Sequence, residues 1–169
     1  MSLGTLYVGL HDEVNIVHEH KPSVYNSINS IGVRSGHHSK NHNWTFGHNF
    51  NFMMDMKHPD IEDLTMWNWT LGGYIEKKFR RDTECKYYFS MPLTLSYGRA
   101  TTEAHPENHK GNFFLAESEL LLNFKWATEC SFWIGLGYRQ SIGSDVYAQS
   151  DADLSGMTIN FGLRFAGYK

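Results

Sequence analysis

The chain has 169 residues, with 18 acidic against 15 basic side chains and a net charge of −3 at pH 7. This length fits a single domain, and a charge so close to neutral excludes a typical nucleic-acid-binding protein. No run of about 18 apolar residues occurs, so the sequence offers no transmembrane helix. A transmembrane β-barrel is still compatible with the sequence, because half of the residues in each of its strands are polar and no long apolar run is needed.

Bulky and small side chains alternate along the chain, and this alternation predicts eight β-strands, since successive side chains of a strand point to opposite faces. In chain order the predicted strands cover 4–11, 25–35, 43–56, 64–79, 86–100, 112–126, 131–141 and 156–166. We assign residues 1–169 to one barrel domain. Residues 1–3 are interpreted as an artificial start on a mature chain whose secretory signal has been removed.

The third predicted strand indicates best which face meets which surroundings. Its even positions, from Trp44 to Met56, are mostly large and apolar, whereas its odd positions include Gly47 and Asn49. A strand facing water would carry Lys, Glu or Arg there, whereas Gly, Asn and Thr suit a crowded interior. The bulky face is therefore expected to point outwards into lipid. His48 falls on that outward face, unless a bulge shifts the strand.

The other strands repeat this division. The bulky face of the first two carries Leu6, Val8 and Leu10, then Ile31 and Val33. In the later strands the outward set is Trp67, Trp69, Leu71, Gly73, Ile75, Phe89, Met91, Leu93, Leu95, Tyr97, Phe114, Ala116, Ser118, Leu120, Leu122, Phe124, Phe132, Ile134, Leu136, Tyr138, Met157, Ile159, Phe161, Leu163 and Phe165. The residues between them are expected to point inwards.

The connections predict two different ends. Those at one end, 12–24, 57–63, 101–111 and 142–155, are mostly longer than 36–42, 80–85 and 127–130 at the other. Bacterial outer-membrane barrels have long outer loops, short periplasmic turns and an even strand number. Aromatic belts are expected at both membrane surfaces, with Trp67, Trp69, Tyr97, Phe113, Phe114 and Tyr138 at the long-loop end, and Trp44, Tyr87, Phe89, Phe124, Trp126 and Trp133 at the other.

Charged residues on the inward faces need partners. They are Glu76, Glu117, Glu119, Lys125, Arg139 and Arg164. Side chains fill an eight-stranded barrel, and a buried isolated charge is very costly. Because the last three strands are neighbours, we expect Glu117 and Glu119 to form a network with Arg139 and Arg164 that plugs the lumen.

The chain resembles small bacterial outer-membrane barrels in its repeated amphipathic hairpins and in two segments. These segments are Phe132-Trp-Ile-Gly-Leu-Gly-Tyr138 and the final Ile159-Asn-Phe-Gly-Leu-Arg-Phe165. The relatives meant are outer membrane proteins A and X, the opacity proteins and the lipid A palmitoyltransferase. The chain departs from them by four residues after Phe165. The resemblance implies an all-β, eight-stranded antiparallel up-and-down transmembrane barrel in the outer membrane of a Gram-negative bacterium. It carries over no functional residue.

Two observations keep an enzyme open as the alternative function. His37 and Ser39 are reminiscent of the lipid A deacylase barrels, although Lys40 replaces the asparagine that follows the serine there. A serine nucleophile also needs a base within hydrogen-bond reach. Pro92 removes a backbone donor in mid-strand, which either marks a tolerated bulge or opens a gap for lipid entry, as in the lipid A palmitoyltransferase.

Histidine and cysteine give weaker hypotheses. The chain has 10 His, and His18, His20, His105 and His109 fall in two connections that could meet over the barrel mouth as a metal site. Exposed, polar loop histidines are the alternative. Cys85 and Cys130 begin the fifth and seventh strands, about 10 Å apart across the sixth, so they could pair only if a turn moved.

The sequence therefore predicts a monomeric, non-enzymatic outer-membrane barrel without a cofactor, which stabilises the membrane or presents surface loops. Its expected partners are the lipid bilayer and lipopolysaccharide. Acidic residues such as Asp60, Glu62 and Asp63 gather in the long connections, where they either are simply solvated or meet the divalent cations that bridge lipopolysaccharide. A lipid A-modifying acyltransferase or deacylase is the first alternative. A soluble lipocalin-like barrel, with its aromatic faces inwards around an apolar ligand, is the second.

Overall fold

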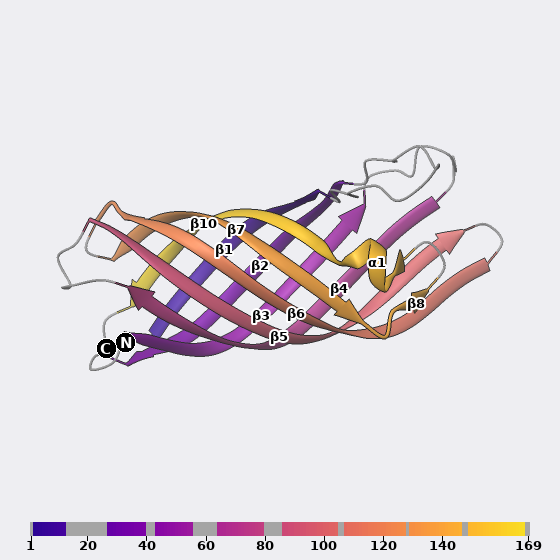
Figure 1. Ribbon diagram of the computed structural model, residues 1–169, viewed down its shortest axis with the longest axis horizontal. Coiled ribbons are helices and arrows are strands. Elements are labelled where there is room, and N and C mark those ends of the chain that lie inside the picture. The colour runs from indigo at the N-terminus through magenta and orange to yellow at the C-terminus, as the bar shows by residue number, and fades with distance from the viewer. Residues whose placement is uncertain are drawn as a thin grey trace.

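The computed structural model describes residues 2–12, 27–39, 43–55, 64–79, 86–104, 107–127, 129–146 and 149–167. They form a closed antiparallel barrel in the strand order β1-β10-β7-β6-β5-β4-β3-β2 (Figure 1). The wall strands are β1 (Ser2–Asp12), β2 (Ser27–Ser39), β3 (Trp44–Asp55), β4 (Leu64–Phe79), β5 (Tyr87–Ala104), β6 (Glu107–Lys125), β7 (Cys130–Ile142) and β10 (Gly156–Gly167). The predicted eight-stranded up-and-down architecture is confirmed.

Three parts of the predicted strand map are wrong. Most of 101–111 belongs to β5 and β6, which stay paired from Thr101↔Lys110 to Ala104↔Glu107. Residues 36–39 likewise extend β2. In both places the backbone ladder runs on where the side-chain alternation weakens. β1 begins at Ser2, and Ser2 and Leu3 pair with both β2 and β10.

The third error lies between β7 and β10, where a plain connection was expected. It contains two short paired strands, β8 (Asp145–Val146) and β9 (Gln149–Ser150), followed by the helical turn α1 (Asp151–Leu154). β8 contacts β5 and β6, and α1 contacts β7. No helix in the described ranges has the length and apolar character needed to cross a membrane.

The pairing register sets the tilt of the wall. We start at Met53 on β3 and step from each residue to its partner on the next strand. One full turn around the barrel ends at Asn43, ten residues before Met53 in the sequence. Such a stagger requires strands tilted against the barrel axis, typically by about 35–45°. Both termini lie at the end where β2 stops and β3 begins (Figure 1).

The predicted sidedness is confirmed wherever side chains are described. Phe50, Leu95 and Leu136 on the outer face are 46 %, 62 % and 57 % exposed, whereas Asn49 and Thr94 are buried. For β1, only the backbone is described. His48 faces outwards, and the β2–β3 and β3–β4 registers continue past it without a bulge. The outer face is thus mostly apolar, and the inner face is mostly small or polar.

Two residues assigned to the aromatic belts lie elsewhere. Phe113 and Trp133 are buried on the inner face, at 1 % and 0 % exposure. Their positions follow from the strand alternation, which puts them on the opposite face from Phe114 and Phe132. A bulky aromatic side chain is therefore not by itself a sign of the lipid-facing surface in this barrel.

Candidate functional site

The barrel interior holds ion pairs at two levels. Near the short-turn end, Arg164 on β10 donates from Nη2 to Oε1 of Glu76 on β4, at 2.8 Å. Nη1 of Arg164 lies 3.4 Å from the hydroxyl of Tyr88 on β5. All three side chains are almost completely buried. The pair joins opposite walls, because β4 and β10 are not neighbours in the barrel.

The second level lies further along the barrel and contains two arginines and two glutamates. Arg34 on β2 donates to Glu119 on β6 and has its Nη2 3.9 Å from Oε2 of Glu117. Arg139 on β7 donates to Glu117 across 3.3 Å. Asn160 on β10 adds a 2.6 Å hydrogen bond to the other oxygen of Glu119. We call these four charged residues the central cluster; its formal charge is zero.

Close backbone approach makes room for the central cluster. A Cβ placed on Gly137 would lie 2.8 Å from Cγ of Glu119 and 2.7 Å from the hydroxyl of Thr158. Both contacts are shorter than real Cβ atoms tolerate, so only glycine lets the Glu119 side chain lie against β7. Gly137 is one of the small residues from which the inward face of the seventh strand is predicted, and here the close contact with Glu119 explains why the residue is glycine.

The structure brings together part of the predicted network. Glu117 does contact Arg139, but the partner of Glu119 is Arg34, and Arg164 lies with Glu76 instead of with either glutamate. Lys125 is half-buried at the end of β6. Reasoning from neighbouring strands missed Arg34, because its partner is on the far wall, 85 residues away. The strand alternation could have found it, since Arg34 follows Ser30 and Gly32 on the inward face of β2.

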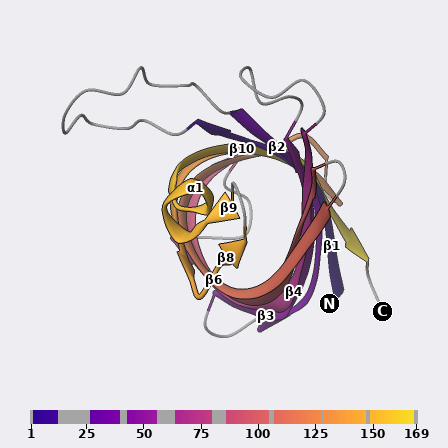
Figure 2. The same ribbon diagram turned by 90° about the vertical axis from the view of Figure 1, so that its right-hand side faces the viewer.

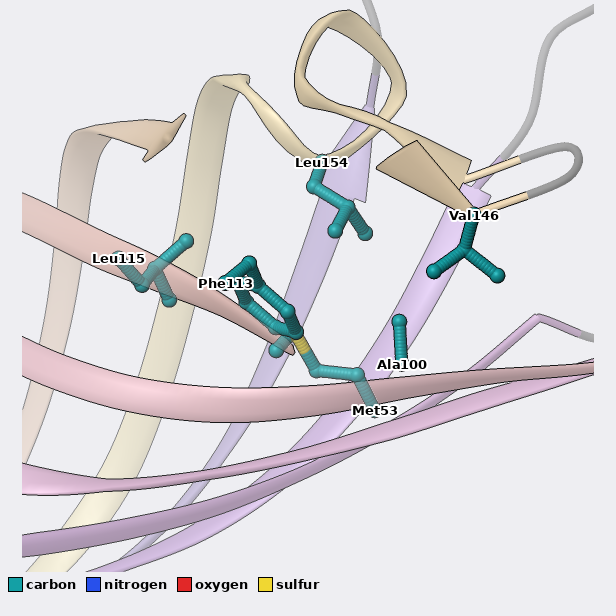
Figure 3. Close-up of a cluster of buried hydrophobic side chains, with 6 residues drawn as sticks. All are labelled: Met53, Ala100, Phe113, Leu115, Val146 and Leu154. Atoms are coloured by element: carbon teal, nitrogen blue, oxygen red, sulfur yellow. The ribbon is translucent and has the colours of Figure 1, made fainter. Parts of the chain in front are cut away.

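Arg139 marks the boundary between the polar and apolar parts of the interior. Its Nη1 lies 3.0 Å from the sulfur of Met53. Met53 belongs to a buried apolar cluster with Ala100, Phe113, Leu115, Val146 and Leu154 (Figure 3). Val146 comes from β8 and Leu154 from α1, so the segment between β7 and β10 supplies apolar side chains to this cluster.

We call residues 143–155 the cap. Seen from the end opposite the termini, β8 and β9 lie inside the outline of the barrel (Figure 2). Asp151 fixes the cap through three hydrogen bonds, accepted from the N–H groups of Gly143 and Ser144 at 2.8 and 2.7 Å and from the Ser141 hydroxyl at 3.0 Å. Slight burial raises the pKa of Asp151, but these hydrogen bonds outweigh it and hold the pKa below its ordinary value.

The cap is therefore expected to loosen in acid. A carboxylate with a lowered pKa contributes its stability above the unfolded-state value, about 3.9 for aspartate, and loses it as the pH falls through the folded value. Amide chemical shifts of Gly143 and Ser144, followed by NMR from neutral to acidic pH, should move together in that range. Asp151→Asn should shift both resonances already at neutral pH. The control is Asp145→Asn, which alters an exposed carboxylate; an equal response to both variants would refute this role of Asp151.

His37 and Ser39 lie in β2, not in a turn as predicted. Both fall on its outer face, while His38 between them is buried and its Nδ1 lies 3.1 Å from the Thr45 hydroxyl. His37 is exposed, and no hydrogen bond between His37 and Ser39 occurs in the described part of the chain. The structure therefore brings these two residues to one face without assembling a base and a nucleophile.

The predicted metal site falls mostly outside the described residues, which include only His109, half-buried in β6. Among the residues described, no group of three His, Cys, Asp or Glu side chains is arranged to hold a metal ion. Cys130 begins β7, but Cys85 lies outside the described ranges, so the disulfide stays a prediction. The acidic connection with Asp60, Glu62 and Asp63 also lies outside them.

Pro92 interrupts the ladder without forming a bulge. The β5–β6 pairs Ser90↔Leu121 and Leu93↔Ser118 keep the same register, and only positions 91 and 92 lack a partner on β6. On the other side Pro92 is still opposite Glu76 of β4. Of the two alternatives for Pro92, the register therefore contradicts the bulge and leaves a short gap in the β5–β6 ladder.

An apolar outer face, buried ion pairs inside and a closed antiparallel wall of eight strands define the architecture of small outer-membrane β-barrels. Solved structures with this fold agree. The crystal structure of Neisserial surface protein A matches with a TM-score of 0.68 and 11 % identity, over 98 % of this chain and 95 % of that one. A major outer membrane protein from Thermus thermophilus matches with a TM-score of 0.58 and 9 % identity, over 98 % and 99 % of the two chains.

The attachment invasion locus protein Ail of Yersinia pestis, solved in a phospholipid bilayer nanodisc, matches with a TM-score of 0.51 and 14 % identity, over 98 % and 99 % of the two chains. No protein-family model matches the sequence. No curated protein matches it either. At these identities the likeness establishes the fold, and the chain's function has to be argued from its own residues.

Proposed function

We propose that this protein is a non-catalytic bacterial outer-membrane barrel with a side-chain-filled polar lumen, which stabilises the membrane or presents its long-loop end to a partner. The observation that carries the proposal is the pairing of interior charges. Arg34, Glu117, Glu119 and Arg139 are each at least 98 % buried and neutralise one another. Buried charges arranged in this way support a plug, because a conducting pore needs water along its whole length.

The outer face supports the proposed membrane location. Exposed large apolar side chains occur on the lipid-facing positions of every strand from β2 to β7 and on β10, far more than the surface patch of a soluble monomer. This arrangement is the reverse of a lipocalin-like barrel, whose apolar residues would point inwards. Two structural neighbours, Neisserial surface protein A and the attachment invasion locus protein Ail, favour presentation at the cell surface.

Refolding and conductance test the proposal together. The purified chain should fold only with detergent or phospholipid, and its gel mobility should change on heating. In planar bilayers it should give no stable channel. Arg139→Ala with Glu117→Ala, which empties part of the central cluster, should raise conductance. Folding in plain buffer, or an open channel in the parent protein, would contradict the proposal.

Analysis of lipid A from expressing cells tests the enzyme alternative. Lipid A extracted from cells that express the chain should have the same mass spectrum as lipid A from cells without it. Gain or loss of an acyl chain, abolished by His37→Ala or Ser39→Ala, would establish a lipid A-modifying enzyme instead.

A further inference from the structure

Polar side chains interrupt the apolar outer face over β2, β3 and β4. Register places Ser39 beside Trp44 and Lys77, His37 beside Phe46 and Ile75, and Ser35 beside His48 and Gly73, in three successive rows that all face outwards. We call these nine residues the β2–β4 patch. Its polar members form a track from the short-turn end of β2 towards the middle of the wall.

The track reaches well into the apolar band. His48 is four residues from Trp44 along β3, which amounts to about 10 Å of height at about 3.3 Å per residue and a tilt of about 40°. The lipid-facing apolar band of such barrels is about 25 Å tall. An ionisable side chain at this depth normally has a partner and marks a functional site.

A groove lies beside His48. It has a volume of about 550 Å³ and is lined by Phe46, Gly47, His48, Gly73, Tyr74, Ile75, Leu93 and Leu95. Gly73 leaves it open, because a Cβ there would meet only the carbonyl oxygen of Gly47, at 3.6 Å. The floor therefore has space for a chain of methylene groups between Phe46, Ile75 and the leucines.

A charge stands at the lower end of the patch. The ammonium group of Lys77 lies 4.7 Å from the centre of the Trp44 ring, an aromatic residue of the type that sits at the membrane surface. The patch has a cation at the membrane surface, hydrogen-bonding side chains next to it and an apolar groove further into the bilayer. This order matches that of phosphate, ester and acyl chain in a phospholipid. A second copy of the chain fits less well, because between the belts the outer faces of the described strands carry no carboxylate for Lys77.

We propose that the β2–β4 patch binds one anionic phospholipid of the leaflet at the short-turn end. Its phosphate would contact Lys77, its ester oxygens would accept hydrogen bonds from His37, Ser35 or His48, and one acyl chain would lie in the groove over Gly73. This inference rests on the membrane location proposed above and adds a specific lipid site to it.

Photolabelling tests the site. The protein is refolded into phosphatidylcholine vesicles that contain phosphatidylglycerol with a diazirine in its acyl chain, and labelled residues are mapped by mass spectrometry. Labelling of β3 and β4 should exceed that of β7 and β10 by roughly three- to tenfold, the effect expected of a single hydrogen bond. Gly73→Leu should fill the groove and bring the labelling of β3 and β4 down to the level of β7.

Matched variants keep the test specific. Ala116→Leu adds nearly the same bulk on the outer face of β6, beyond Leu95, and should leave the labelling pattern unchanged. Lys77→Met should lower labelling by phosphatidylglycerol but not by a phosphatidylcholine probe. Uniform labelling around the wall, or an unchanged pattern in Gly73→Leu, would overturn the inference while heat-modifiable mobility still upheld the membrane location. Failure to enter vesicles at all would count against the proposed function itself.

Discussion

Replacing Glu119 by leucine is expected to lower the free energy of unfolding by about 3–5 kcal/mol, because it leaves a buried charge without compensation. The substitution leaves Arg34 and Arg139 to share Glu117, so the central cluster gains a net positive charge where water is excluded. It also removes the hydrogen bond from Asn160. Urea unfolding in phospholipid vesicles, followed by tryptophan fluorescence, measures the loss.

Two further variants separate charge from packing. Glu119→Gln keeps an oxygen that accepts the hydrogen bond of Asn160 but loses the negative charge. Its free energy of unfolding should therefore lie between those of Glu119→Leu and the parent protein. Arg34→Met combined with Glu119→Leu leaves one neutral Glu117–Arg139 pair and should recover stability to within about 1 kcal/mol of the parent. If the double variant were less stable than Glu119→Leu alone, the ion pair itself would stabilise the barrel, and the desolvation argument would be wrong.

The wall could be predicted because one physical rule acts on every strand of it. Lipid outside and a narrow interior inside force a change of side-chain character at each residue, so positions such as Phe50 and Asn49 are assigned correctly without any tertiary information. Strand ends were harder. At Thr101 and Thr102 both side chains are buried, and the alternation that defines a strand is lost although the ladder continues.

The interior contacts were only partly predictable, because they join strands across the barrel. Glu117 and Arg139 lie on neighbouring strands, and local reasoning paired them. Arg34 and Glu119 meet across the lumen, a relation fixed by strand number and stagger together, neither of which alternation reveals. The same limit explains Arg164, whose partner Glu76 is 88 residues away.

The cap was missed for a different reason. Its strands have two residues each and its helix four, too short for any periodic pattern. Its order comes from tertiary contacts, namely Val146 and Leu154 in the apolar cluster and the hydrogen bonds accepted by Asp151. A buried apolar mouth could have been suspected from Phe113 and Leu115, which fall on the inward face of β6 and need apolar neighbours.

A charge placed in the middle of the outer face should destabilise the barrel in lipid. Leu136 lies on the outer face of β7, midway along the strand and 57 % exposed. Leu136→Arg is expected to cost about 2–4 kcal/mol in phospholipid vesicles, the range for arginine at the bilayer midplane. The matched control is Ile142→Arg at the end of the same strand, where the cost near the interface is about 0–1 kcal/mol.

The difference between the two destabilisation energies tests the membrane location more sharply than either energy alone. Leu136 and Ile142 are both outward-facing and almost equally exposed, at 57 % and 59 %, so in water arginine would be tolerated equally well at both. Only a lipid phase makes the cost depend on depth along the strand. Equal, small effects of the two substitutions would mean that solvent covers this face, and the membrane location would then have to be abandoned despite the barrel fold.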